Sequence, residues 1–180
     1  MDLLIGIFGF ILYFLYDWNR VFAKKQWMSK FFLIGTLCQC YVGMRYLLVG
    51  VTGSHPNRFG WLLLAAVFLI LLVYTLFFAL PFDSTYCKKA ENHKVCRTGL
   101  YGLCRHPGIW WFFGCFFCLG IAAGDLEVFM GGLFLSGLNL AYAWYQDKWI
   151  FPKEFVDYRE YQKDVPFLIP VKRKQSGESL

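Results

Sequence analysis

Five long apolar runs, separated by short polar segments, dominate the pattern of this chain. A helix needs about 20 mostly apolar residues to cross the roughly 30 Å hydrocarbon core of a bilayer, because it rises about 1.5 Å per residue. Each run reaches or approaches that length. The pattern therefore predicts an all-α, polytopic membrane helical bundle of about five transmembrane helices. The predicted spans are residues 3–16, 31–51, 60–82, 108–123 and 126–145.

The first run, residues 3–16, is short and resembles the apolar part of a secretory signal peptide. However, no basic residue precedes it, and no small-residue cleavage site occurs in residues 17–20, which follow it. We therefore expect a retained first span, extended by the flanking Trp18 and Arg20 side chains, which can reach the membrane interface.

A different pattern follows the fifth run, where apolar residues recur at helical spacing from 151 to 165. This spacing predicts a C-terminal amphipathic helix that begins at Pro152 and lies in the membrane interface. The two prolines in residues 165–170 would then keep the chain extended. We expect a single integrated domain with an N-terminal three-span scaffold (1–82), a C-terminal part of loop, helical hairpin and amphipathic helix (83–170), and a disordered tail (171–180).

Composition and charge agree with a membrane protein. The chain is 58% hydrophobic, with a mean hydropathy of +0.44 and a net charge of +6. Of its 18 Lys and Arg residues, 16 lie in the first loop, the third loop and the C-terminal segment, whereas Arg45 and Arg58 lie on the opposite side of the predicted spans. The positive-inside rule therefore places those loops and the C-terminus in the cytosol and the N-terminus outside. Since the charges follow the topology, we expect no nucleic-acid partner.

The seven cysteines point to packing. Four of them fall inside predicted spans, where a thiol behaves as a small hydrophobic group. The other three, taken with His93, show no regular ligand spacing, so we predict no metal site. In chain order the cysteines are Cys38, Cys40, Cys87, Cys96, Cys104, Cys115 and Cys118.

Candidate chemistry gathers in residues 99–107, Gly-Leu-Tyr-Gly-Leu-Cys-Arg-His-Pro, which end the third loop. Arg105 and His106 are the last polar side chains before the fourth run, so they should lie where water meets hydrocarbon. Pro107 suits the first turn of a helix, because the N–H that it lacks would have no partner there.

The fourth and fifth runs should form a tight hairpin, since Gly124-Asp125 between them is a turn-forming pair. Such a hairpin returns Asp147 to the same border as His106. We therefore expect a mixed site that holds an ionised ligand from the cytosol while a lipophilic partner enters from the bilayer. Its expected members are Tyr101, Arg105, His106, Trp110, Trp144, Tyr145, Asp147, Tyr158, Arg159 and Tyr161.

Residues 95–170 resemble the isoprenylcysteine carboxyl methyltransferase and phospholipid N-methyltransferase superfamily of membrane methyltransferases. The earlier runs match this superfamily only in being hydrophobic. The matching motifs are Gly99-x-Tyr101-x-x-x-Arg105-His106-Pro107, an acid some 40 residues later, Tyr158-Arg159-Glu160-Tyr161, and Val165-Pro166-x-x-Ile169-Pro170.

The resemblance implies a site for S-adenosylmethionine beside the membrane and a lipid or lipidated methyl acceptor. The implied cofactor-binding residues are Gly99, Tyr101, Arg105, His106, Pro107 and Asp147, with His106 and Asp147 as the catalytic pair. From their place at the border we assign Trp110, Trp144, Tyr158, Arg159 and Tyr161 to the acceptor.

The chain departs from the family pattern at three places. The tyrosine that usually lies two residues after the proline is Ile109, the usual pair of glutamates is Gln146-Asp147, and the usual Phe-Gly ahead of the first tyrosine is Glu154-Phe155.

Methyl transfer from S-adenosylmethionine requires few catalytic groups from the protein, because the sulfonium is already an excellent leaving group. Alignment of the reactants, exclusion of water and aromatic faces for the cation suffice. A carboxylate acceptor is a nucleophile at neutral pH, whereas an amine must first lose a proton to His106, Asp147 or Glu160. The sequence does not choose between these acceptors.

Two alternatives remain open on the sequence alone. One is an NADPH-dependent reductase similar to the membrane steroid reductases, whose C-terminal region has a related basic-proline motif. The other is a non-catalytic membrane protein on the same scaffold, which the departures at Ile109 and Gln146 favour.

Overall fold

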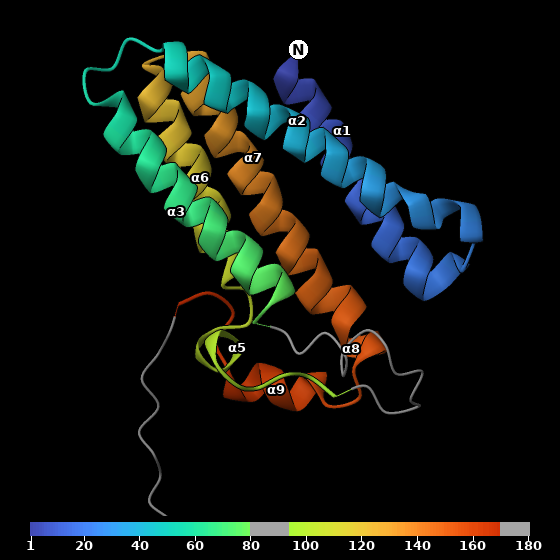
Figure 1. Ribbon diagram of the computed structural model, residues 1–180. Coiled ribbons are helices and arrows are strands. Elements are labelled where there is room, and N and C mark those ends of the chain that lie inside the picture. Colours follow the sequence, from blue (N-terminus) through green and yellow to red (C-terminus); the bar gives the residue numbers. More distant parts are fainter. Residues whose placement is uncertain (80–93, 170–180) are drawn as a thin grey trace, which may run out of the picture.

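The computed structural model describes residues 1–79 and 94–169, and within these residues the protein is all-helical, without strands (Figure 1). The predicted all-α class is therefore confirmed. Five long helices run through the molecule, and shorter helices gather at one end of them. The long helices are α1 (Asp2–Trp18), α2 (Lys30–Thr52), α3 (Arg58–Phe77), α6 (Gly108–Ala123) and α7 (Leu126–Tyr145).

Among the described residues, four helical runs are long and apolar enough to cross a membrane, which indicates an integral membrane protein. They are Asp2–Ala23, Gln26–Thr52, Arg58–Phe77 and Leu126–Glu154. Helix α6 is equally apolar but has 16 residues, so it extends only about 24 Å. Helix α3 ends at Phe77, before the predicted end of its run, and residues 80–82 of that run lie outside the described residues.

Helix α6 lies at the centre of the bundle, between α3 and α7, and α2 also packs against it (Figure 1). Helix α1 packs on α2 and α7. Both predicted parts of the chain contribute to one core, because its buried residues come from all five long helices. They are Phe10, Val42, Tyr46, Ala65, Cys115, Phe116, Cys118, Leu119 and Leu135.

The hairpin of α6 and α7 forms as predicted from its turn residues. Gly124 closes α6 in the left-handed region (φ 62°), which favours glycine. The Asp125 side chain then caps α7 by accepting a hydrogen bond from the Val128 N–H at 3.0 Å. Above the turn, a Cβ at Gly120 would lie 2.8 Å from the Phe129 Cα, so this glycine lets the two backbones approach closely.

The C-terminal segment differs from the single amphipathic helix predicted for it. A π-helical turn, η3 (Gln146–Ile150), extends α7 and leads into α8 (Phe151–Glu154); the separate helix α9 (Tyr158–Asp164) follows. Phe155 is extended (φ −111°, ψ 128°) and breaks the helix. The break lets α9 bury Tyr158, Tyr161 and Val165 in a small core of their own, against Val95 and the rings of Phe151 and Phe155.

Two other sequence predictions concern residues that the structure leaves undescribed. The tail predicted to be disordered, residues 171–180, lies outside the described residues. Cys87 and His93, the two members of the irregular cysteine set that fall within 80–93, are likewise outside them.

Candidate functional site

The candidate site lies at one end of the bundle, where the short helices α5 (Leu100–Leu103), α8 and α9 lie together (Figure 1). Gly99 precedes α5 with φ 60° and ψ −134°, a conformation that residues other than glycine rarely adopt. The chain is extended at Cys104, and Pro107 then caps α6. This local path places Arg105 and His106 in the short segment between α5 and α6.

Arg105 and Asp147 form a buried, two-pronged ion pair. The Arg105 Nε donates to Asp147 Oδ1 at 2.7 Å, and its Nη2 donates to Oδ2 at 3.0 Å. Their side chains are only 10% and 9% exposed. A fork-like pairing of this kind fixes the plane of both groups and is stronger than a contact between neutral partners.

Three further side chains converge on the Asp147 carboxylate. Tyr158 donates its hydroxyl proton to Oδ1 at 2.7 Å, and the His106 Nε2 lies 3.3 Å from the same oxygen. Gln162 donates its Nε2 to Oδ2 at 3.0 Å and to the Asp147 carbonyl at 2.9 Å. Both carboxylate oxygens thus have protein donors, and the five side chains Arg105, His106, Asp147, Tyr158 and Gln162 form what we call the Asp147 cluster.

The hydroxyl of Tyr158 is a permanent donor in this cluster. Burial raises the pKa of the Tyr158 phenol, and the neighbouring Asp147 carboxylate raises it further, since both disfavour a second negative charge. Tyr158 therefore keeps its proton throughout the physiological pH range and holds Oδ1 of Asp147.

The segment 165–169, which we call the C-terminal strap, runs alongside the start of α6. The backbone N–H groups of Arg105 and His106 donate to the carbonyls of Pro166 and Phe167 at 2.9 and 3.2 Å. The Arg105 Nη1 also donates to the carbonyl of Val165. The strap therefore holds both the backbone and the side chain of the motif.

Two aromatic rings flank the His106 imidazole. The Phe167 ring of the strap lies 4.9 Å from it between centroids, and the Phe151 ring of α8 stacks almost parallel to it at 6.0 Å. The imidazole thus contacts apolar ring faces as well as the Asp147 carboxylate.

The structure brings together four of the predicted site residues, namely Arg105, His106, Asp147 and Tyr158, and Pro107 adjoins them. Two predicted tyrosines lie beside the cluster with other partners. Tyr161 donates to the carbonyl of Tyr101, whose hydroxyl donates to the carbonyl of Thr75 at 3.1 Å. These bonds link α9 and α5 to the end of α3.

Other predicted members point elsewhere. Trp144 is 52% exposed on α7, where the Lys148 ammonium lies 4.8 Å from its ring centroid. Arg159 is exposed on α9. Glu160, the third candidate base, has a 76% exposed side chain and lies 3.7 Å from the Arg97 guanidinium.

Sequence reasoning missed the roles of Gln162, Phe151 and Phe167. A signal for Gln162 was present, because it follows Tyr158 by four residues and so shares its helix face. The two phenylalanines gave no such signal, since an apolar ring near a membrane has many ordinary places to pack.

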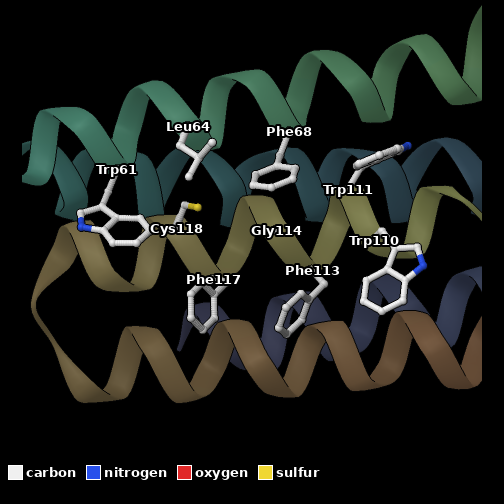
Figure 2. A pocket seen from close by; sticks show the side chains of 9 residues that line it. All are labelled: Trp61, Leu64, Phe68, Trp110, Trp111, Phe113, Gly114, Phe117 and Cys118. Atoms are coloured by element: carbon white, nitrogen blue, oxygen red, sulfur yellow. The ribbon is translucent and has the colours of Figure 1, made fainter. Parts of the chain in front are cut away.

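An apolar groove of about 590 Å³ runs between α3 and α6 and starts beside the site (Figure 2). At its near end, Trp110 donates its indole N–H to the Leu168 carbonyl of the strap at 3.0 Å. Trp61 lies at the far end (Figure 2). The lining residues are Trp61, Leu64, Phe68, Trp110, Trp111, Phe113, Gly114, Phe117 and Cys118.

Trp110 thus connects the apolar groove to the strap that binds Arg105 and His106. This arrangement suits a ligand with an ionised head and a hydrocarbon chain. Among the residues that the structure describes, no group of three or more His, Cys, Asp or Glu side chains is placed to hold a metal ion. Comparison of the chain with protein-family models, with curated proteins and with solved structures finds no match.

Proposed function

We propose that this protein is an integral membrane methyltransferase that transfers the methyl group of S-adenosylmethionine to a lipophilic acceptor. The observation that carries the proposal is the buried Asp147 cluster, which the strap connects to Trp110 at one end of the apolar groove. Its central residues Arg105 and His106 belong to the motif on which the resemblance to membrane methyltransferases rests.

The proposal includes a topology of five spans, with the N-terminus outside and the C-terminus and the site in the cytosol. The distribution of Lys and Arg supports it. So does the grouping of the short helices α5, α8 and α9 at one end of the bundle, with the N-terminus at the other (Figure 1). Helix α6 counts as the short fourth span, because its turn into α7 requires both helices to reach the same border.

The residues of the cluster fit the cofactor in chemical type. S-adenosylmethionine carries a carboxylate, an ammonium and a sulfonium, and the cluster offers a guanidinium, an imidazole and aromatic faces. Arg105 and His106 would hold the carboxylate end, and the rings of Phe151 and Phe167 would face the cation. The bound cofactor supplies a methyl group on a good leaving group, so the protein needs only to align the reactants and exclude water.

Asp147 acts in this proposal by holding its neighbours. Because both of its oxygens already accept protein donors, it fixes the orientation of Arg105 and His106. Saturation with donors also makes it a weak base. For an amine acceptor, His106 would be the proton acceptor among the three candidates, since Glu160 pairs with Arg97, and the cofactor's carboxylate would then be left to Arg105 alone.

The acceptor's apolar part would lie in the groove between α3 and α6. Trp110 belongs to both regions, because its ring lines the groove and its indole N–H binds the strap. A chain lying along the groove would bring its head group to His106, only one helical turn away from Trp110. This places the reacting group at the border between the membrane and the cytosol.

The proposal is tested by methyl transfer in membranes that contain the protein. We expect methyl-tritiated S-adenosylmethionine to label material that extracts into organic solvent, and we expect His106→Ala to abolish this labelling. His55→Ala is the matched control, because His55 lies in the loop between α2 and α3 at the other end of the bundle (Figure 1). Labelling that is equal in all three proteins and in membranes without the protein would refute the proposal.

A non-catalytic role is the second candidate, and one observation favours it. The Asp147 cluster is satisfied by its own members and by the strap, and its central side chains are about one-tenth exposed. Such a cluster also serves to tie the C-terminal segment to the bundle. A folded protein that neither binds nor uses S-adenosylmethionine would support this role.

A further inference from the structure

A second buried polar network lies on the α1 side of η3. Its centre is Asp17, in the last turn of α1, which is 1% exposed. The Asp17 Oδ2 accepts hydrogen bonds from the Tyr142 hydroxyl at 2.6 Å and from the Gln146 Nε2 at 2.8 Å. Its Oδ1 lies 3.3 Å from the Arg20 Nη2. A buried carboxylate is costly unless it is paired in this way.

The network holds the segment that carries Asp147 at both ends. Gln146, the first residue of η3, is bound by Asp17. Glu154, the last residue of α8, accepts a hydrogen bond from Arg20 at 2.7 Å. Asp17 belongs to α1, and Arg20 belongs to η1 (Asn19–Ala23), the turn that follows it. The end of the first helical run therefore binds both ends of residues 146–154.

The π-helical turn sends two adjacent side chains to different networks. Gln146 turns to Asp17 on α1, while Asp147 turns to Arg105 and His106 at the start of α6. Because the two residues share one peptide unit, a movement of Gln146 also moves the Asp147 carboxylate. Insertions of this kind in a helix are frequent at functional sites, where they aim a side chain.

The amide of Gln146 matches the carboxylate of Asp17. A glutamate at position 146 would place a second carboxylate within hydrogen-bond distance of a fully buried one, and the two charges would repel. The amide instead donates its N–H to Asp17 and also to the Tyr142 hydroxyl, at 2.9 Å.

We propose that Asp17 is a positioning residue for the candidate site: through Gln146 it fixes the turn that aims Asp147 at Arg105 and His106. The inference rests on the proposed function where cofactor affinity is the readout. It differs from a simple tie between α1 and α7, because a tie affects only the stability of the bundle, whereas a positioning residue also changes the surroundings of His106.

The test uses Asp17→Asn, Gln146→Glu and the double variant in the full-length protein. Asp17→Asn removes the charged acceptor, and Gln146→Glu sets two carboxylates against each other. The double variant exchanges amide and carboxylate across the same contact and so restores an amide-to-carboxylate bond. Two quantities are measured on each protein, namely the ¹⁵N resonances of the His106 ring and the Kd for S-adenosylmethionine.

We expect each single substitution to shift the His106 resonances and to raise the Kd roughly tenfold, because small misplacements of a site group have effects of at least this size. The double variant should recover both. The chain has only three histidines, so His106→Ala identifies the signal. Where Asp17→Asn does not fold, Gln146→Ala carries the same expectation, since it removes the bond without adding a charge.

Tyr13→Phe is the matched control, because it removes a hydrogen bond between α1 and α2 (Tyr13 hydroxyl to Thr36 Oγ1, 3.1 Å) that does not involve η3. It should leave the His106 resonances unchanged. The inference is overturned if Gln146→Ala, which removes the bond to Asp17, also leaves them unchanged. Since these resonances are recorded without cofactor, a wild-type protein that binds no S-adenosylmethionine would refute the proposed function and leave this test valid.

Discussion

Asp147→Ala is expected to lower the free energy of unfolding by about 3–5 kcal/mol, the loss typical of breaking a buried ion pair on one side. Without the carboxylate, the Arg105 guanidinium loses its counter-ion. It nevertheless stays buried, because its side chain is only 10% exposed. The Tyr158 hydroxyl and the Gln162 amide lose an acceptor in the same step.

Denaturant unfolding of the purified protein in detergent measures this effect. Asp164→Ala is the matched control, because Asp164 also pairs with an arginine, Arg97, at 3.2 Å, but its side chain is 40% exposed. An exposed pair of this kind contributes about 1 kcal/mol or less. Equal losses in the two variants would show that burial does not set the importance of the Arg105–Asp147 pair.

Removal of the C-terminal strap is expected to have the second large effect. A chain that ends after residue 164 lacks the carbonyls that accept from the backbones of Arg105 and His106 and from the Trp110 indole. It also lacks the Val165 carbonyl that accepts from the Arg105 side chain. Four lost hydrogen bonds, at about 0.5–1.5 kcal/mol each, amount to several kcal/mol.

The reference for this truncation is a chain that ends after residue 169, which keeps every one of these bonds. Unfolding of the two truncated proteins is compared under the same conditions, so that their difference isolates residues 165–169. If both unfold at the same denaturant concentration, the strap does not hold the start of α6, and the Asp147 cluster stands without it.

The hairpin that builds the site was predictable because its determinants are local. Gly124 and Asp125 specify the turn, and α6 and α7 have the predicted bounds. Once the two helices are antiparallel, Asp147 must return to the level of His106. The Arg105–His106–Asp147 part of the cluster follows from this geometry without any knowledge of distant contacts.

The C-terminal helix was predicted wrongly because spacing along the chain does not distinguish one helix from two. The residues at 151, 155, 158, 162 and 165 keep helical spacing across the break at Phe155. The chain is instead held by distant contacts, such as the hydrogen bond from the Val95 N–H to the Asp157 Oδ1 at 2.9 Å. This contact reaches across 62 residues, so it leaves no periodic signal in the sequence.

Asp17 was equally hidden from sequence reasoning. It follows the first apolar run as an ordinary flanking residue, and its partner Tyr142 lies 125 residues away. The position of Asp17 also explains why residue 146 is a glutamine. What reads in the sequence as a departure from a pair of glutamates is, in the folded protein, an amide donor beside a buried carboxylate.

The central claim, that the Asp147 cluster binds S-adenosylmethionine, is tested most directly by calorimetry on the detergent-solubilised protein. NADPH serves as the competing ligand, and His106→Ala and His55→Ala serve as the paired variants. We predict micromolar binding of S-adenosylmethionine that His55→Ala retains and His106→Ala loses, and no binding of NADPH. Binding of NADPH in its place, or of neither ligand by folded protein, would contradict it.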